Sequence, residues 1–66
     1  MYRNLENEMR AKNITIDDIA EAIKTSAGEA QKKVNGEETM LFKEGLIIWQ
    51  RFFSYRTFEY LFENDG

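Results

Sequence analysis

Residues 15–36 read TIDDIAEAIKTSAGEAQKKVNG, and this stretch contains two helix-start signals in close succession. Thr15 is suited to cap a helix, with Asp18 three residues later as in a capping box, and the apolar residues that follow keep helical spacing. Ser26 is a second capping residue, with Glu29 at the matching position. Only residues 24–26 separate the two predicted helices. Two short helices joined by so short a turn form a helix-turn-helix.

The rest of the chain predicts three more helices and no strand. It contains no Pro and only four Gly, and no stretch alternates apolar and polar residues as a half-buried strand does. The helix after Ser26 should run over residues 27–34 and end at Asn35-Gly36, because Gly tolerates the left-handed conformation at a helix C-terminus. A first helix should begin with Asn4 as its cap. The prediction is a single all-α domain of five helices over residues 1–66, whose parts are a first helix at 4–12, a helix-turn-helix core at 15–35, and two last helices at 42–53 and after Thr57, within 42–62.

Helical spacing also predicts the core. On the segment 42–53, one stripe at 100° per residue holds Trp49, which is expected to be buried with Gly45 making room for its indole. Ile47 points to the opposite side and should be exposed. The stripe consists of Phe42, Gly45, Leu46, Trp49, Phe52 and Phe53. The side chains expected to be mostly buried are Leu5, Met9, Ile19, Ala20, Ile23, Ala30, Val34, Leu46, Trp49, Phe52, Leu61 and Phe62.

Composition argues against an enzyme. A chain of 66 residues buries only about 60% of its unfolded surface, which leaves little room for a catalytic cleft. It has no Cys and no His, so thiolate metal sites and the commonest general base are absent. The carboxylates Asp17, Asp18 and Glu21 are interpreted as helix-start and solvated charges. We therefore expect no enzymatic activity, metal, cofactor or small-molecule substrate.

The N-terminus has no signal-peptide pattern, and the longest apolar run, residues 46–49, is far too short to span a bilayer. A cytoplasmic protein without membrane contact is expected. The net charge of −3 is unusual for a nucleic-acid-binding protein, because phosphate contacts favour a basic surface.

The quoted stretch nevertheless resembles a known motif. TIDDIAEAI at 15–23, followed by Ser26 and then by VNG at 34–36, resembles the core of the phage repressor/Cro family of helix-turn-helix proteins. YRNLE at 2–6 and FEYLF at 58–62 resemble short prophage-encoded members, so the likeness covers nearly the whole chain. Members of this family bind operator DNA, usually as dimers, with the third helix in the major groove. The resemblance implies a transcription regulator that binds duplex DNA as a homodimer.

The resemblance also implies which positions touch DNA, and this sequence departs from the family at several of them. Ala27 and Gly28 stand at base-reading positions without a hydrogen-bonding side chain. Ile16 replaces a polar phosphate ligand, and the loop that often supplies a Lys carries acidic residues. Lys24 replaces the usual Gly of the turn. The side chains that remain suitable for DNA binding are Lys24, Gln31, Lys32, Lys33 and Asn35.

A second interpretation uses the same scaffold for protein binding. The acidic residues Glu29, Glu37 and Glu38 would then compete for a basic, nucleic-acid-binding groove on a host protein. Such a protein would be an antirepressor or an inhibitor of the anti-CRISPR kind. In either interpretation, an apolar surface for a dimer or partner contact is expected at Met40, Leu41, Ile47 and Tyr55.

Overall fold

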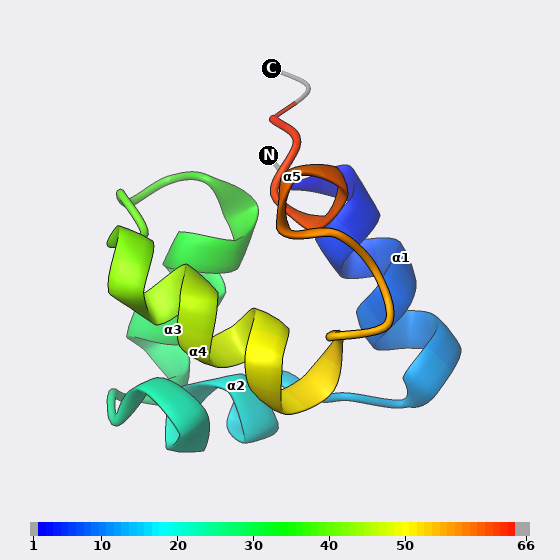
Figure 1. The fold of residues 1–66 in the computed structure, drawn as a ribbon. Coiled ribbons are helices and arrows are strands. Elements are labelled where there is room, and N and C mark those ends of the chain that lie inside the picture. The colour runs from blue at the N-terminus through cyan, green and yellow to red at the C-terminus, as the bar shows by residue number, and fades with distance from the viewer. Residues whose placement is uncertain (1, 65–66) are drawn as a thin grey trace.

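Five α-helices make up the computed structural model, which describes residues 2–64 and contains no strand among them (Figure 1). The prediction of an all-α, five-helix chain is confirmed. α2 packs against α3 and α4, while α5 returns to lie beside α1 and also contacts α4 (Figure 1). The helices are α1 (Arg3–Lys12), α2 (Ile16–Ile23), α3 (Ala27–Asn35), α4 (Phe42–Phe52) and α5 (Phe58–Leu61).

Side-chain caps fix the starts of three helices. At α2, the Thr15 hydroxyl accepts from the Asp18 N–H at 3.2 Å, and the Asp18 carboxylate accepts from the Thr15 N–H at 2.9 Å. The Ser26 hydroxyl accepts from the Glu29 N–H at 3.2 Å and starts α3. Thr57 does the same for α5. Each bond satisfies an N–H that has no partner inside its helix, so the predicted starts of α2, α3 and α5 are confirmed.

The start of α1 differs from the prediction. Asn4 was expected to cap this helix, but α1 begins at Arg3, and Asn4 lies inside it. Its side-chain amide donates to the carbonyl of Tyr60 at 2.9 Å. The local sequence pattern predicted a cap, but the Asn4 side chain instead forms a long-range hydrogen bond that links α1 to α5.

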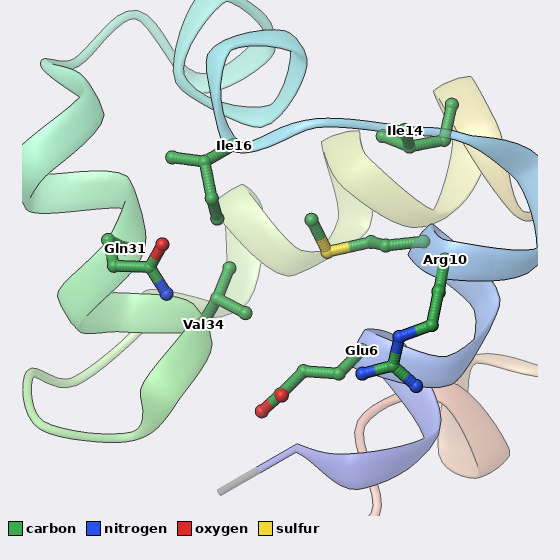
Figure 2. Close-up of a pocket in the computed structure, with 7 residues that line it drawn as sticks. Glu6, Arg10, Ile14, Ile16, Gln31 and Val34 are labelled. Atoms are coloured by element: carbon green, nitrogen blue, oxygen red, sulfur yellow. The ribbon is translucent and has the colours of Figure 1, made fainter.

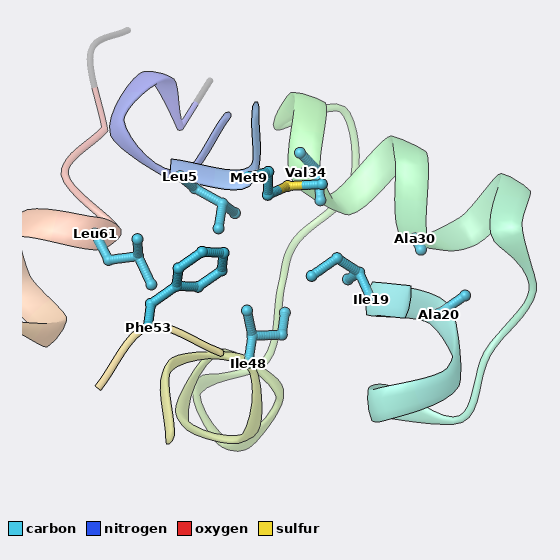
Figure 3. Packing of buried hydrophobic residues seen from close by; sticks show 9 residues of the cluster. All are labelled: Leu5, Met9, Ile19, Ala20, Ala30, Val34, Ile48, Phe53 and Leu61. Carbon is cyan, nitrogen blue, oxygen red and sulfur yellow. The ribbon is translucent and has the colours of Figure 1, made fainter. Parts of the chain in front are cut away.

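All five helices contribute side chains to the core, and Figure 3 shows Leu5, Ile48 and Phe53 pointing towards one another there. Most of the predicted core is buried, but Ile23, Leu46, Trp49, Phe52 and Phe62 are only half-buried. The predicted core omitted Ile48, Ala22 and Phe53, which are also buried, although Phe53 was placed on the stripe of residues 42–53. The buried apolar side chains are Leu5, Met9, Ile19, Ala20, Ala22, Ala30, Val34, Ile48, Phe53 and Leu61.

The orientation of α4 explains the difference. One of its faces turns Ile48 fully into the core, while the neighbouring face meets the aromatic side chains of α5. The ring of Phe58 lies 5.3 Å from that of Phe42 and 6.2 Å from that of Trp49. Phe42, predicted on the buried stripe, remains 69% exposed. A prediction that assumes one buried stripe at 100° per residue places its centre between these two faces of α4. It therefore misses Ile48.

Two details of this region correct the prediction for Trp49. A Cβ at Gly45 would stand 3.5 Å from the rings of Phe58 and Phe62, an ordinary van der Waals distance, so Gly45 faces the aromatic side chains of α5 and does not make room for the indole. The indole N–H of Trp49 donates to the carbonyl of Arg56 at 2.6 Å. Trp49 therefore ties α4 to the segment that leads into α5.

A buried carboxylate holds the same segment against α1. Glu8 is only 7% exposed and accepts a hydrogen bond from the hydroxyl of Tyr55. The Arg56 Nε lies 3.1 Å from the other carboxylate oxygen of Glu8. The bond from Tyr55 to Glu8 raises the pKa of Tyr55. Because both carboxylate oxygens have partners, the cost of burying this charge is largely offset.

Candidate nucleic-acid interface

The turn between α2 and α3 is made of the three predicted residues, Lys24 to Ser26. Lys24 adopts a left-handed conformation with φ of 58° and ends α2, and its N–H donates to the Glu21 carbonyl at 3.3 Å. The Thr25 N–H donates to the Ala20 carbonyl at 2.9 Å. A glycine would adopt this φ without the steric cost that a Cβ brings, so the Lys here carries a small backbone strain. The turn sets the angle at which α3 leaves α2.

The face of α3 that was predicted to read bases is exposed. Ala30 and Val34 are buried, and Ala30 has so small a side chain that α3 lies close to α2. The exposed positions are Ala27, Gly28, Gln31 and Lys32. α3 is therefore held by one edge and presents the other to solvent.

Gly28 stands on this face without any internal reason to be glycine. Its φ is not positive, and within the described chain the nearest atom to a Cβ at this position would be the Ser26 Oγ, 4.0 Å away. Glycine also weakens a helix relative to alanine. An exposed glycine does allow another molecule to approach the helix backbone closely.

Lys33, predicted to bind DNA, is held by α4. Its ammonium lies 2.9 Å and 2.7 Å from the two carboxylate oxygens of Glu44, and both side chains are almost nine-tenths buried. The bond to Glu44 raises the pKa of Lys33. Burial opposes the charge of Glu44, but hydrogen bonds from Lys33 and from the Leu41 N–H outweigh it and lower the pKa of Glu44. This ion pair takes one of the five predicted DNA contacts away from the exposed face.

Two further predicted contacts are engaged with each other. The Gln31 amide donates to the Asn35 side-chain oxygen at 2.9 Å, and the Asn35 amide donates to the Glu37 carboxylate at 3.2 Å. These two consecutive hydrogen bonds order the end of α3 and the loop after it. The amide groups would have to exchange partners to contact a base or phosphate, whereas Lys24 and Lys32 are exposed.

The acidic residues predicted for the alternative gather around the same helix. Contact with the Glu29 carboxyl raises the pKa of Glu38, which indicates that the two carboxyl groups lie close together. Glu37 is exposed and accepts from Asn35. Six acidic and three basic residues lie within 15–38, so this segment has a net charge of −3, equal to that of the whole chain. The negative charge is thus concentrated on the helix pair and its following loop.

The predicted partner surface divides into separate parts. Met40 and Leu41 line a shallow apolar groove, and Phe42 at its rim is the most exposed large apolar side chain described. Ile47 is 40% exposed, as predicted, but does not line this groove. Tyr55 is exposed as well, with its hydroxyl bound to Glu8. The other residues of the groove are Tyr2, Gly45, Phe58 and Phe62.

In the described part of the chain, no three acidic side chains are grouped in a way that could hold a metal ion. None of the helices over residues 2–64 is long and apolar enough to cross a membrane. Comparisons with family models, with curated protein sequences and with solved structures find no match to this chain.

Proposed function

We propose that this protein is a DNA-binding transcription regulator of the phage or prophage type, in which α2 and α3 form a helix-turn-helix. The observation that supports the proposal is the position of α3, which follows a three-residue turn and keeps its face from Ala27 to Lys32 exposed. In a helix-turn-helix protein, this face of the second helix enters the major groove.

In this proposal, Gln31 and Lys32 face the base edges and Lys24 reaches a phosphate. The small residues Ala27 and Gly28 let the start of α3 come close to the DNA backbone, where free helix N–H groups can donate to a phosphate. Lys33 can contact a phosphate only after its ion pair with Glu44 is broken. Few phosphates are contacted, so the affinity depends on salt less steeply than for a strongly basic domain.

The test is a fluorescence-anisotropy titration of the chain against duplex DNA at several salt concentrations. With two to four phosphates neutralised per subunit, the logarithm of the association constant should fall by roughly 2–4 per tenfold increase in salt for one bound subunit, and by roughly twice as much for a bound dimer. Lys32→Ala should weaken binding, whereas Arg51→Ala, which removes the same charge from the end of α4, should not. Failure to bind any duplex at low salt, or equal losses in the two variants, would contradict the proposal.

Operator binding by this class of protein uses two copies, and the exposed apolar pair Leu41 and Phe42 is the surface we propose for that contact. Light scattering should show a dimer in the native chain, and Phe42→Ser should shift it towards monomer without loss of helix content. A strict monomer at high concentration would remove this part of the proposal.

A second candidate function is binding to a basic protein, as an antirepressor or an inhibitor of a nucleic-acid-binding host factor. It is favoured by the net charge of −3 on residues 15–38 and by the withdrawal of Lys33 into an ion pair. Carboxylates on the face of α3 and its loop would then occupy the basic groove that otherwise holds nucleic acid.

Charge reversal distinguishes the two functions. The double variant Glu37→Lys, Glu38→Lys replaces repulsion of DNA by attraction at the loop after α3, while Glu59→Lys, Glu63→Lys makes the same change at the other end of the chain. If the native chain binds no duplex and only the first variant gains DNA affinity, the protein-binding function is supported. Tight, sequence-selective DNA binding by the native chain would exclude it.

A further inference from the structure

Two cations and two tyrosines form a cluster where the end of α1 meets α5 and the segment before it. The Lys12 ammonium lies 4.7 Å from the centre of the Tyr55 ring. The Arg56 Cζ lies 5.7 Å from the centre of the same ring and 5.2 Å from that of Tyr60. All four side chains are exposed. We call these four residues, Lys12, Tyr55, Arg56 and Tyr60, the tyrosine–cation surface.

Hydrogen bonds from α1 and α4 hold the backbone of this surface in place. The Trp49 indole donates to the Arg56 carbonyl at 2.6 Å, and the Asn4 amide donates to the Tyr60 carbonyl at 2.9 Å. A segment that is already ordered loses little conformational entropy when a partner binds. Tyrosine and arginine are also the side chains that most often dominate protein interfaces. The tyrosine–cation surface therefore has both the rigidity and the composition of an interaction site.

The two cations keep donor groups that the chain itself does not use. Glu8 binds the Arg56 Nε and the Tyr55 hydroxyl, but it is buried, so its charge lies beneath the surface. Within residues 2–64, the Lys12 ammonium and the Nη groups of Arg56 form no hydrogen bond or ion pair. In that part of the chain neither cation is paired with an exposed carboxylate, including that of Glu59 on α5. The surface is thus positively charged, with free N–H donors.

This property separates the tyrosine–cation surface from the groove of about 250 Å³ between α1, the start of α2 and α3. Figure 2 shows that Glu6 and Arg10 both line that groove, so a carboxylate and a guanidinium offset each other there. The groove has no charge preference that selects an occupant, whereas the exposed charges of the tyrosine–cation surface have one sign.

Free donors of this kind bind carboxylates or phosphates. The Nη edge of a guanidinium matches a carboxylate, and such charge-assisted hydrogen bonds are the strong ones. Single-stranded nucleic acids bind by stacking bases on aromatic faces, but here cations already lie over both tyrosine rings. The arrangement therefore favours the carboxylates of a protein over a nucleic-acid strand.

The surface is also separate from the predicted DNA-binding face. In Figure 1, α1 and α5 lie side by side on the right and α3 lies on the left. A partner bound to the tyrosine–cation surface leaves the exposed face of α3 open. The inference that follows therefore does not depend on DNA binding.

We propose that the tyrosine–cation surface binds an acidic segment of a protein partner. Carboxylates of that segment contact the Lys12 ammonium and the Nη groups of Arg56, and the Tyr55 and Tyr60 rings form the contact area around them. Charge complementarity carries the assignment, because the free groups of this surface are cationic donors.

The probe is the capped peptide Asp-Glu-Asp-Glu, followed through the ring NMR signals of Tyr55 and Tyr60 in the native chain. The matched peptide Asn-Gln-Asn-Gln has the same length and nearly the same shape but no charge. The acidic peptide should cause saturable shifts at both rings, and the neutral peptide should bind about tenfold more weakly, because two ion pairs are lost. Added salt should weaken binding of the acidic peptide only.

Lys12→Gln provides the second arm of the test. It should weaken binding of the acidic peptide roughly two- to fivefold, the range expected for one exposed ion pair, whereas Lys43→Gln, an exposed cation of α4, should leave it unchanged. Equal binding of the two peptides, equal losses in the two variants, or shifts that map elsewhere would overturn the proposal. Tighter binding of a short oligothymidylate at the same two rings would overturn it in favour of a nucleic-acid strand. Duplex DNA titrations are a separate measurement, so a failure here leaves their result readable.

Discussion

Glu44→Gln should make DNA binding more sensitive to salt, because it releases Lys33 from its ion pair. In the native chain both carboxylate oxygens of Glu44 accept from the Lys33 ammonium, and one of them also accepts from the Leu41 N–H. A glutamine keeps an oxygen for the Leu41 N–H, so the start of α4 is preserved. Its neutral amide binds Lys33 weakly, and the ammonium becomes available to a phosphate near the end of α3.

The size of the change follows from counting phosphates. Each additional phosphate contact steepens the slope of log K against log salt by about 0.9. If Lys33 adds one contact per subunit, the bound dimer gains two, and lowering the salt from about 0.2 M to about 0.05 M should strengthen its binding roughly twelvefold more in the variant than in the native chain; for a single bound subunit the difference is roughly three- to fourfold.

The assay is the anisotropy titration repeated over this salt range, with circular dichroism to confirm that the helices are retained. Glu59→Gln changes the net charge equally but touches no lysine of α3, so it separates the release of Lys33 from a general charge effect. An unchanged slope in a folded Glu44→Gln variant, or the same change in both variants, would refute the reasoning.

Three other predictions concern stability. Gly28→Ala should stabilise the fold by about 0.5 kcal/mol, which raises the melting temperature by roughly 3–4 °C in calorimetry, and yet weaken DNA binding if the backbone approaches DNA there. Ile48→Ala should cost about 2–5 kcal/mol and unfold most of the chain by circular dichroism, whereas Ile47→Ala on the exposed side should change stability by no more than about 0.5 kcal/mol. The pKa of Glu38 is raised above 4.5, so its protonation favours the folded state, and that contribution is lost as the pH rises through the raised pKa. Glu38→Gln should therefore raise the urea midpoint at pH 7, and the gain should vanish below about pH 4.5; a constant gain at all pH values would contradict this account.

Helix starts were predictable from the sequence because they depend on neighbours a few residues apart. Thr15 with Asp18, and Ser26 with the Glu29 N–H, form the expected caps. Asn4 has the same local appearance but bonds to Tyr60, 56 residues away. The burial of Ile48 was missed for a related reason, since α4 packs on α2 with one face and on α5 with the next.

For the candidate site, the sequence predicts which face of α3 is exposed but not the partners of the side chains on that helix. The exposed positions of α3 follow from helical spacing, because Ala30 and Val34 mark the buried edge. The partner of Lys33 could not be found in this way, since Glu44 comes from another helix. The burial of Glu8 and of one carboxylate oxygen of Glu6 is likewise a product of tertiary packing, and neither residue has a local signal that sets it apart from an ordinary surface carboxylate.

The contact between α1 and α5 has a consequence for synthesis of the chain. Leu5 and Phe53 are fully buried beside Leu61, and Asn4 is tied to Tyr60, so the core is complete only when residues 58–62 are in place. While α5 is still inside the exit tunnel of the ribosome, the apolar core residues of the nascent chain therefore remain exposed to solvent. Chaperones and quality-control proteases have access to it until α5 docks, and a translation product that stops before residue 58 stays in that vulnerable form.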